Sequence, residues 1–214
     1  MRIDGIIFDS DGTLVDSEIL SARAISQILQ EAGADLSVDE VLERFRGCRF
    51  SVFTEELLRD YPVIGPEAFI PAFRQRSAAL FAQELQPMNG ALEVVAAITI
   101  DKCVASNGPR EKIESCLGTT GLLPYFEDRV VSAYEVGSWK PDPDLILHAA
   151  SVMGLSPSRC ILVEDSLAGV QAGLAAGVEV IGYRLSEATQ AAVGHRVRVI
   201  QELAELHGLL ETPR

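Results

Sequence analysis

Short apolar segments alternate with segments of helical periodicity through the second half of this chain, and this alternation restricts the fold more than any other feature of the sequence. We expect strands at residues 103–106, 130–132, 160–163, 178–182 and 197–200. We expect helices at residues 91–98, 110–117, 144–153, 167–176 and 202–210. Strands that alternate with helices form βαβ units, in which a parallel sheet is covered on both faces. A short, mainly apolar run at residues 3–8, interrupted by Asp4, is typical of a buried parallel strand and is assigned to the same sheet.

A long helical segment follows this first strand. Residues 17–85 show helical spacing of apolar side chains and contain no convincing strand. We expect four helices, at residues 18–31, 37–45, 51–59 and 66–85. Gly33 is suited to end the first, and Ser37 and Glu40 have the spacing of a capping box at the start of the second. Pro71 is expected to kink the fourth helix or to divide it. The chain is therefore predicted to be an α/β protein with a helical insertion after its first strand.

The charge and residue content argue against several classes of partner and site. The chain has 31 acidic and 18 basic residues and a formal net charge of −13, so neither nucleic acid nor an anionic membrane is expected as a partner. No stretch approaches the roughly 20 apolar residues of a membrane span, and the N-terminal apolar run is too short for a secretory signal. The three histidines are isolated, which argues against a histidine metal site or a Ser-His-Asp triad. The four cysteines are irregularly spaced and are interpreted as reduced thiols of a cytoplasmic protein.

Polar side chains come directly after the expected strands or in the loops that join them to the next helix. These residues are Asp9 and Asp11, Ser106 and Asn107, Lys140, and Glu164 and Asp165. In parallel α/β sheets, ligands bind beyond the carboxyl ends of the strands. We therefore expect these side chains to meet at one edge of the sheet.

This set of side chains indicates phosphoryl transfer. Neighbouring carboxylates disfavour each other's charged form unless a cation is bound, and oxygen ligands without histidine or thiolate indicate Mg²⁺. Mg²⁺ and a lysine together neutralise the oxygens of a transferred phosphoryl group. Asp9 is placed to form an aspartyl-phosphate, and Asp11 to protonate the leaving oxygen and then activate water. Three of the segments alone are more often an ordinary turn or helix cap, and DSDGT alone is about equally often an acidic turn or part of a calcium loop. The four in this order favour the catalytic interpretation.

The same segments resemble the four motifs of the haloacid dehalogenase superfamily of aspartate-nucleophile phosphohydrolases. The matching strings are FDSDGT at residues 8–13, VASNG at 104–108, WKPDP at 139–143 and LVEDS at 162–166. The resemblance implies a Rossmann-like core of residues 1–15 and 87–214, with an inserted all-helical cap of residues 16–86.

The resemblance also implies roles for individual residues. Asp9 would be the nucleophile and Asp11 the general acid and base. Mg²⁺ would be bound by Asp9, the backbone carbonyl of Asp11 and Asp165, with Glu164 in or beside that shell. The phosphate group would be held by Ser106, Asn107 and Lys140.

Two details narrow the branch of the family. Dehalogenases lack an acid two residues after the nucleophile, so Asp11 favours phosphate esters. DGTLVDSE and LVEDSLAG are similar to the β-phosphoglucomutase-like and sugar-phosphate phosphatase branch. Its mutases carry a histidine near the position of Ser21, whereas this chain has none between Met1 and Leu147. Hydrolysis of a small sugar or sugar-acid phosphate is therefore favoured, with a phosphomutase as the alternative.

A phospho-accepting signalling module is a remote alternative. A response-regulator receiver also combines an aspartate, a lysine, a hydroxyl and an acidic pair. In a receiver, however, the acidic pair follows the first strand and the phospho-acceptor follows a middle one, and no long helical insertion intervenes.

Selectivity for the substrate is expected to come from the cap. Arg46 and Arg49 lie close together, and no acid occurs between Arg44 and Thr54. They form either a solvated helix end or a loop that binds a second anionic group of the substrate. The next candidates are Arg74 and Arg76, and the single Trp139 is expected to fix the loop that carries Lys140. The partner is thus a small phosphorylated metabolite, and a monomer is favoured.

Overall fold

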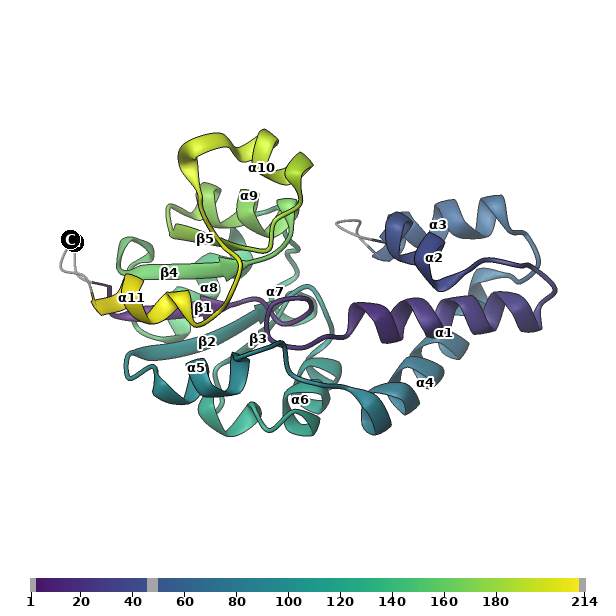
Figure 1. Ribbon diagram of the computed structural model, residues 1–214, viewed down its shortest axis with the longest axis horizontal. Helices are drawn as coiled ribbons and strands as arrows, with labels where there is room; N and C mark the ends of the chain where they lie inside the picture. Colours follow the sequence, from purple (N-terminus) through teal and green to yellow (C-terminus); the bar gives the residue numbers. More distant parts are fainter. Residues whose placement is uncertain (1–2, 46–49, 212–214) are drawn as a thin grey trace. The chain divides into compact units, whose positions relative to one another are not determined.

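The computed structural model describes residues 3–45 and 50–211, and a parallel six-stranded sheet forms its core (Figure 1). The strands are β1 (Gly5–Phe8), β2 (Asp101–Ser106), β3 (Val130–Ser132), β4 (Cys160–Glu164), β5 (Glu179–Tyr183) and β6 (Arg198–Ile200). Their order is β3-β2-β1-β4-β5-β6, and every neighbouring pair is parallel. At the centre, Phe8 pairs with Val104 on one side and with Val163 on the other. The prediction of a parallel α/β sheet is confirmed.

Helices cover both faces of the sheet. They are α5 (Ala91–Ala97), α6 (Arg110–Thr119), α7 (Ala133–Val136), α8 (Asp144–Val152), α9 (Leu167–Ala176), α10 (Glu187–Val193) and α11 (Glu205–Glu211). Short 3₁₀ turns lie at Leu123–Tyr125, Pro157–Arg159 and Gly194–Arg196. Ile7 and Leu162 face α8 and α9 in one buried apolar cluster. Phe8 points to the opposite face, where its ring meets that of Phe126 edge to face and where α5 and α11 lie (Figure 1).

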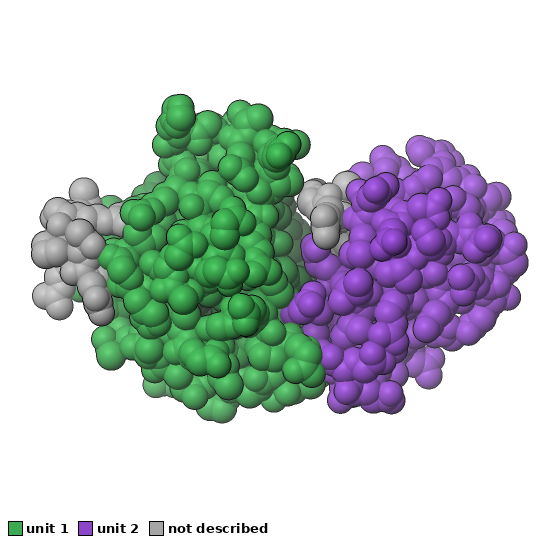
Figure 2. Space-filling model, in the orientation of Figure 1, with its two compact units in different colours: residues 1–15, 86–214 green, residues 16–85 purple. Residues whose placement is uncertain are grey.

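The chain divides into two compact units, which Figure 2 shows in different colours. The first unit contains residues 1–15 and 86–214, including the sheet, and the second contains residues 16–85. Gln86, which the sequence placed at the end of the insertion, belongs to the first unit. The chain therefore leaves the sheet after β1 and returns before α5. No helix in the described part of the chain is both long and apolar enough to span a bilayer.

The second unit consists of four helices, α1 (Glu18–Glu31), α2 (Val38–Phe45), α3 (Phe50–Asp60) and α4 (Pro66–Glu84). The capping box forms: the Ser37 N–H donates to the Glu40 carboxylate at 2.9 Å, and the Glu40 N–H donates to the Ser37 hydroxyl at 3.3 Å. Gly33 has a φ of 92° just after α1, a conformation that favours glycine.

Of the two alternatives expected at Pro71, a kink or a boundary, the boundary does not occur, because α4 continues through this residue. Proline removes one hydrogen bond from a helix interior, here the bond to the carbonyl of Glu67. The turns on either side bury Phe69, Ser77 and Phe81, and Phe69 also stacks on Phe73. This packing keeps the helix continuous although one backbone hydrogen bond is missing.

The sequence did not predict α7 and α10. With four residues, α7 is too short to show a helical period, and α10 has only alanines and one valine to mark one. Their starts are set by side chains: Ser132 accepts a bond from the Tyr134 N–H, and Ser186 accepts one from the Thr189 N–H. The last helix begins at Glu205 rather than at residue 202, because the Glu205 carboxylate caps the preceding backbone N–H groups.

Candidate active site

The carboxyl ends of β1, β2 and β4 lie side by side, and the polar segments that follow them share one edge of the sheet. Asp9 extends the hydrogen bonding between β1 and β4 by one bond, in which its N–H donates to the Val163 carbonyl at 3.0 Å. Ser106 ends β2 and Glu164 ends β4. The register of the sheet thus brings together side chains that are far apart in the sequence.

Lys140 is buried between two carboxylates. Its Nζ donates to Asp9 Oδ1 at 2.6 Å and to Glu164 Oε2 at 2.7 Å. The side chains of Lys140, Asp9 and Glu164 are 3%, 10% and 1% exposed. Because a buried charge is stable only when it is paired and hydrogen-bonded, the three groups depend on one another.

Burial and the neighbouring charges shift the pKa values of Asp9 and Lys140, and for each residue some of these effects oppose one another. Burial, with the Glu164 charge, raises the pKa of Asp9 to about 7, although the Lys140 ammonium opposes the shift. Burial alone would lower the pKa of Lys140, but the Asp9 and Glu164 carboxylates together raise it above its ordinary value. The lysine therefore stays protonated, but its single positive charge does not neutralise both carboxylates.

Asn107 holds the backbone of Lys140 from both sides. The Lys140 N–H donates to Asn107 Oδ1 at 2.9 Å, and Asn107 Nδ2 donates to the Lys140 carbonyl at 3.3 Å. The neighbouring Ser106 hydroxyl is buried and accepts a bond from the Gly108 N–H at 3.1 Å. The loop after β2 therefore anchors the loop that carries the lysine.

Glu164 is held against the first turn of α9. Its Oε1 accepts bonds from the Ser166 N–H at 3.1 Å and the Ser166 hydroxyl at 2.8 Å. A Cβ on Gly169 would lie 1.9 Å from the Glu164 carboxylate carbon. Only glycine at position 169 leaves room for this side chain.

Asp165 is enclosed by the turn after β1. Thr13 Oγ1 donates to Asp165 Oδ1 at 3.3 Å. Gly12 has a φ of 81°, and a Cβ there would lie 2.2 Å from Asp165 Oδ2. The close approach of the turn to Asp165 therefore requires glycine at position 12.

Asp9, Glu164 and Asp165 form a group that fits a divalent cation. Each offers a carboxylate oxygen, and these oxygens lie within 4.8 Å of one another. When Asp11 is included and all four carboxylates are counted as ionised, they exceed the two lysines of this edge, Lys140 and Lys112, by a formal charge of −2. Oxygen donors and this charge suit a hard ion such as Mg²⁺.

Asp11 has a different partner from Asp9. Its Oδ1 accepts a bond from Lys112 Nζ, on α6, at 2.6 Å. The two side chains are 29% and 32% exposed, so this pair is more open to solvent than the Lys140 centre.

The sequence analysis did not identify Lys112. A signal was available, because the chain has only three lysines and one of them follows the Ser106–Asn107 loop.

A family model described as haloacid dehalogenase-like hydrolase matches residues 3–177. The chain belongs to this family. The 6-phosphogluconate phosphatase of Escherichia coli (strain K12) is 37% identical to it over 206 residues, which are 96% of this chain and 93% of that protein. The family and this relative make the chain a haloacid dehalogenase-family phosphatase.

Solved structures of the family have the same fold. A hydrolase of the family from Deinococcus radiodurans R1, solved with bound phosphate and sodium, has a TM-score of 0.81 and 30% identity, covering 98% of this chain and 95% of that one. A candidate β-phosphoglucomutase from Thermotoga maritima has a TM-score of 0.80 and 25% identity, covering 99% and 100%. Both structural matches extend over the residues of the two units of this phosphatase.

The arginines that the sequence assigned to the cap are placed only in part. Arg46 and Arg49 lie outside the described residues. Arg76 forms a two-pronged ion pair with Glu31, and Arg74 is exposed on the same helix. Trp139 packs half-buried against the core of the sheet, and its ring meets that of Tyr134 edge to face.

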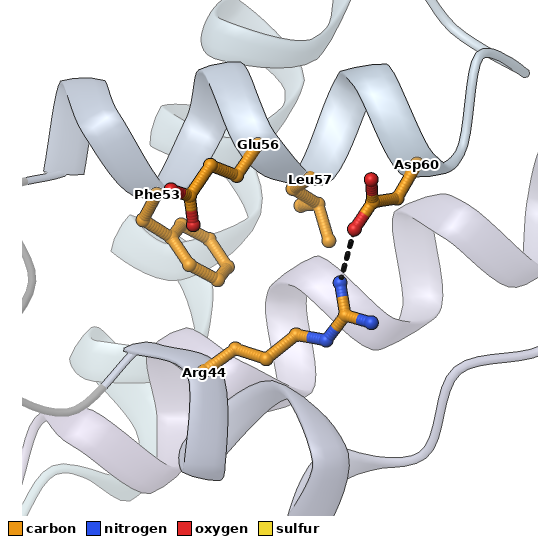
Figure 3. A pocket seen from close by; sticks show the side chains of 5 residues that line it. All are labelled: Arg44, Phe53, Glu56, Leu57 and Asp60. Carbon is orange, nitrogen blue, oxygen red and sulfur yellow. Dashed lines mark hydrogen bonds and ion pairs between the residues drawn. The ribbon is translucent and has the colours of Figure 1, made fainter.

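The helical unit also contains a small pocket between α2 and α3. Its volume is about 200 Å³, and its lining is Arg44, Phe53, Glu56, Leu57 and Asp60 (Figure 3). Arg44 donates to Asp60 at 3.0 Å across the opening. None of the residues predicted for the site lines this pocket.

The fit between Gly169 and Glu164 predicts the effect of one added methyl group. Gly169→Ala forces the Glu164 carboxylate to move, which breaks its contact with Lys140. We expect turnover of any phosphate monoester to fall about 10²- to 10³-fold, as when one oriented donor is lost from an active site. The measurement is steady-state release of phosphate by the purified variant.

Gly208→Ala is the matched control, because Gly208 is also in a helix and a Cβ there meets nothing within 4 Å. This control should keep normal turnover. Normal turnover in Gly169→Ala itself would show that the position of Glu164 does not matter for the reaction.

Proposed function

We propose that this phosphatase hydrolyses the phosphate monoester of a small sugar or sugar acid, through an aspartyl-phosphate on Asp9 and with Mg²⁺ as cofactor. The observation that carries the proposal is the Asp9 carboxylate held 2.6 Å from the buried ammonium of Lys140. This contact fixes the position of a nucleophile that is partly desolvated. It also places a permanent positive charge where a phosphate group would bind.

In the first step, an Asp9 oxygen attacks phosphorus and the bond from phosphorus to the sugar oxygen breaks. Asp11 donates its proton to that oxygen, so the sugar leaves as an alcohol. Lys140 remains protonated and neutralises charge on the phosphoryl oxygens, while Ser106 and Asn107 hold the group in place.

In the second step, a water molecule attacks the phosphorus of the aspartyl-phosphate. Asp11, now ionised, takes a proton from this water, and the bond from phosphorus to Asp9 breaks. Inorganic phosphate leaves and both aspartates return to their starting state. One carboxyl group thus serves as acid and then as base.

The Mg²⁺ ion would be held by Asp9, Asp165 and the backbone carbonyl of Asp11, with Glu164 beside them. When bound, it supplies Lewis-acid stabilisation of the phosphoryl oxygens. The formal charge of −2 and the all-oxygen donor set of this edge support this assignment.

The substrate that we propose is 6-phosphogluconate or a similar sugar-acid phosphate. The support is the 37% identity, over 96% of the chain, to a protein named for that substrate. The residues around Lys140 bind a phosphate group and do not distinguish an acid from an aldose. We assign recognition of the carboxylate to Arg46 and Arg49 of the helical unit.

A phosphomutase is the second candidate, favoured by the likeness to the candidate β-phosphoglucomutase. The absence of histidine between Met1 and Leu147 argues against it. Release of free phosphate, rather than an isomeric sugar phosphate, decides between the two.

Replacing the proposed nucleophile tests the covalent mechanism. Asp9→Asn is close in size and removes the nucleophile together with one metal ligand. We expect no measurable turnover and a folded protein, which phosphate release and circular dichroism measure. Asp128→Asn, at an exposed position, is the control and should remain active. Comparable activity in Asp9→Asn would refute the aspartyl-phosphate.

Removal of divalent ions tests the cofactor. We expect EDTA to stop phosphate release, because the uncompensated carboxylates would then repel the substrate. Added Mg²⁺ in excess of the chelator should restore the rate. A protein that is fully active after exhaustive chelation would contradict the proposed metal site.

Charge removal from the helical unit tests the choice of substrate. A charged hydrogen bond to a carboxylate contributes about 1.5–3 kcal/mol, or about 10- to 100-fold in kcat/KM. Arg46→Ala or Arg49→Ala should therefore reduce kcat/KM for 6-phosphogluconate by about that factor and have little effect on an aryl phosphate.

Arg59→Ala, at an exposed position on α3, is the matched control and should leave both substrates unchanged. Equal losses on both substrates would assign Arg46 and Arg49 to the phosphate or to the fold. No loss on either would exclude them from the carboxylate site.

A further inference from the structure

A second lysine lies beside the proposed catalytic aspartates, and the two-step reaction leaves it without a role. Lys112 Nζ donates to Asp11 Oδ1 at 2.6 Å. The side chains of Lys112 and Asp11 are both about one-third exposed, and they come from α6 and from the turn after β1. The pair therefore joins two segments separated by 101 residues at the edge where the substrate's phosphate would bind.

The local structure holds Lys112 in place for this contact. Its backbone N–H donates to the Pro109 carbonyl at 3.0 Å, at the start of α6. Its Cδ lies 3.5 Å from the position that a Cβ on Gly108 would take, so its stem runs along this glycine. The Gly108 carbonyl in turn accepts a bond from the Ser132 hydroxyl at 2.7 Å. The segment that carries Lys112 is thus tied to both β2 and β3.

The position is also unfavourable for a lysine unless the lysine has a specific partner. Lys112 lies in the first turn of a ten-residue helix, where the helix dipole favours acidic side chains. Asp11 compensates for this, because its carboxylate lies against the ammonium group. The buried lysine of this edge, Lys140, is already shared by Asp9 and Glu164.

We propose that Lys112 is a positioning residue that fixes the carboxyl group of Asp11 beside the leaving oxygen of the substrate. The inference rests on the proposed function, in which Asp11 donates a proton to that oxygen and later takes one from water. Lys112 keeps its proton throughout and forms no bond to the substrate. Its contribution is to limit Asp11 to one orientation, since a misplaced acid transfers its proton less often.

This role makes the effect of Lys112 depend on the leaving group. A sugar alkoxide must be protonated as it departs, whereas p-nitrophenolate leaves readily without a proton. The parameter kcat/KM covers binding and the first chemical step. A defect in the position of the acid therefore lowers kcat/KM for the sugar phosphate much more than for p-nitrophenyl phosphate.

The main experiment compares Lys112→Met with the wild-type protein on 6-phosphogluconate, or on the hexose phosphate that the wild type hydrolyses fastest, and on p-nitrophenyl phosphate. General acid catalysis contributes about 10²- to 10⁴-fold, so loss of its orientation should cost about 10- to 100-fold in kcat/KM for the sugar phosphate. The loss for p-nitrophenyl phosphate should be at least tenfold smaller. Equal losses on both substrates would assign Lys112 to phosphate binding or to the fold and overturn the proposal.

A double-mutant cycle with Asp11→Asn separates positioning from direct binding. If Lys112 acts only through Asp11, Lys112→Met should cause no further loss once Asp11 is replaced. An additional loss of the same size in the double variant would show direct contact with the substrate and would overturn the proposal.

Two further variants guard against a defect in folding. Lys112→Gln keeps a neutral donor and should give a smaller loss with the same preference for the sugar phosphate, and Lys112→Arg should recover most of the rate. Lys102→Met is the matched control, since Lys102 is half-buried at the start of β2 and its Nζ donates to the Ile98 carbonyl. It should leave both substrates unaffected.

The result also distinguishes this inference from the proposed function. A wild-type protein that hydrolyses no phosphate monoester would overturn the proposed function, and the role of Lys112 with it. An active wild type whose Lys112 variants lose both substrates equally would overturn the role of Lys112 alone.

Discussion

The buried ammonium group of Lys140 sets the arrangement of everything around it. Its charge is paired with Asp9 at 2.6 Å and with Glu164 at 2.7 Å. An unpaired charge at this depth would destabilise the fold strongly, so the loops after β1 and β4 and the loop before α8 must all reach one point. The parallel register of β1 and β4 makes this possible. Asn107 adds two hydrogen bonds to the Lys140 backbone, which limits the motion of the lysine loop.

Two glycines adapt the surrounding backbone to the carboxylates. Gly169 leaves space on α9 for Glu164, and Gly12 lets the turn after β1 approach Asp165. In both places a single methyl group would collide with a carboxylate of the acidic edge. The acidic edge is therefore built by close packing as well as by charge. Its formal charge of −2 among the described residues supports the divalent cation that we propose for this edge.

The two lysines at this edge differ in burial, and this difference separates their proposed roles. Lys140 is 3% exposed and is shared by two carboxylates, so its charge stays where a phosphate group would bind. Lys112 is 32% exposed and contacts Asp11, the group to which we assign proton transfer. One lysine would act on the transferred group and the other on the orientation of the acid. Neither contact distinguishes one sugar phosphate from another, which leaves selectivity to other residues.

The sequence by itself determined most of the elements, α7 and α10 excepted, and the polar loops at their ends. The bounds of α1, β3 and α9 agree with the expected ones because periodicity, caps and glycines act within about ten residues. It also indicated that Asp9, Lys140 and Glu164 would meet, since strand ends of a parallel sheet share one edge. Tertiary structure alone decided that Asn107 clamps the Lys140 backbone and that Lys112 pairs with Asp11. These contacts join residues 33 and 101 positions apart. The small number of lysines could have marked Lys112 as a candidate, but its partner depends on sheet register and helix packing, which no local pattern encodes.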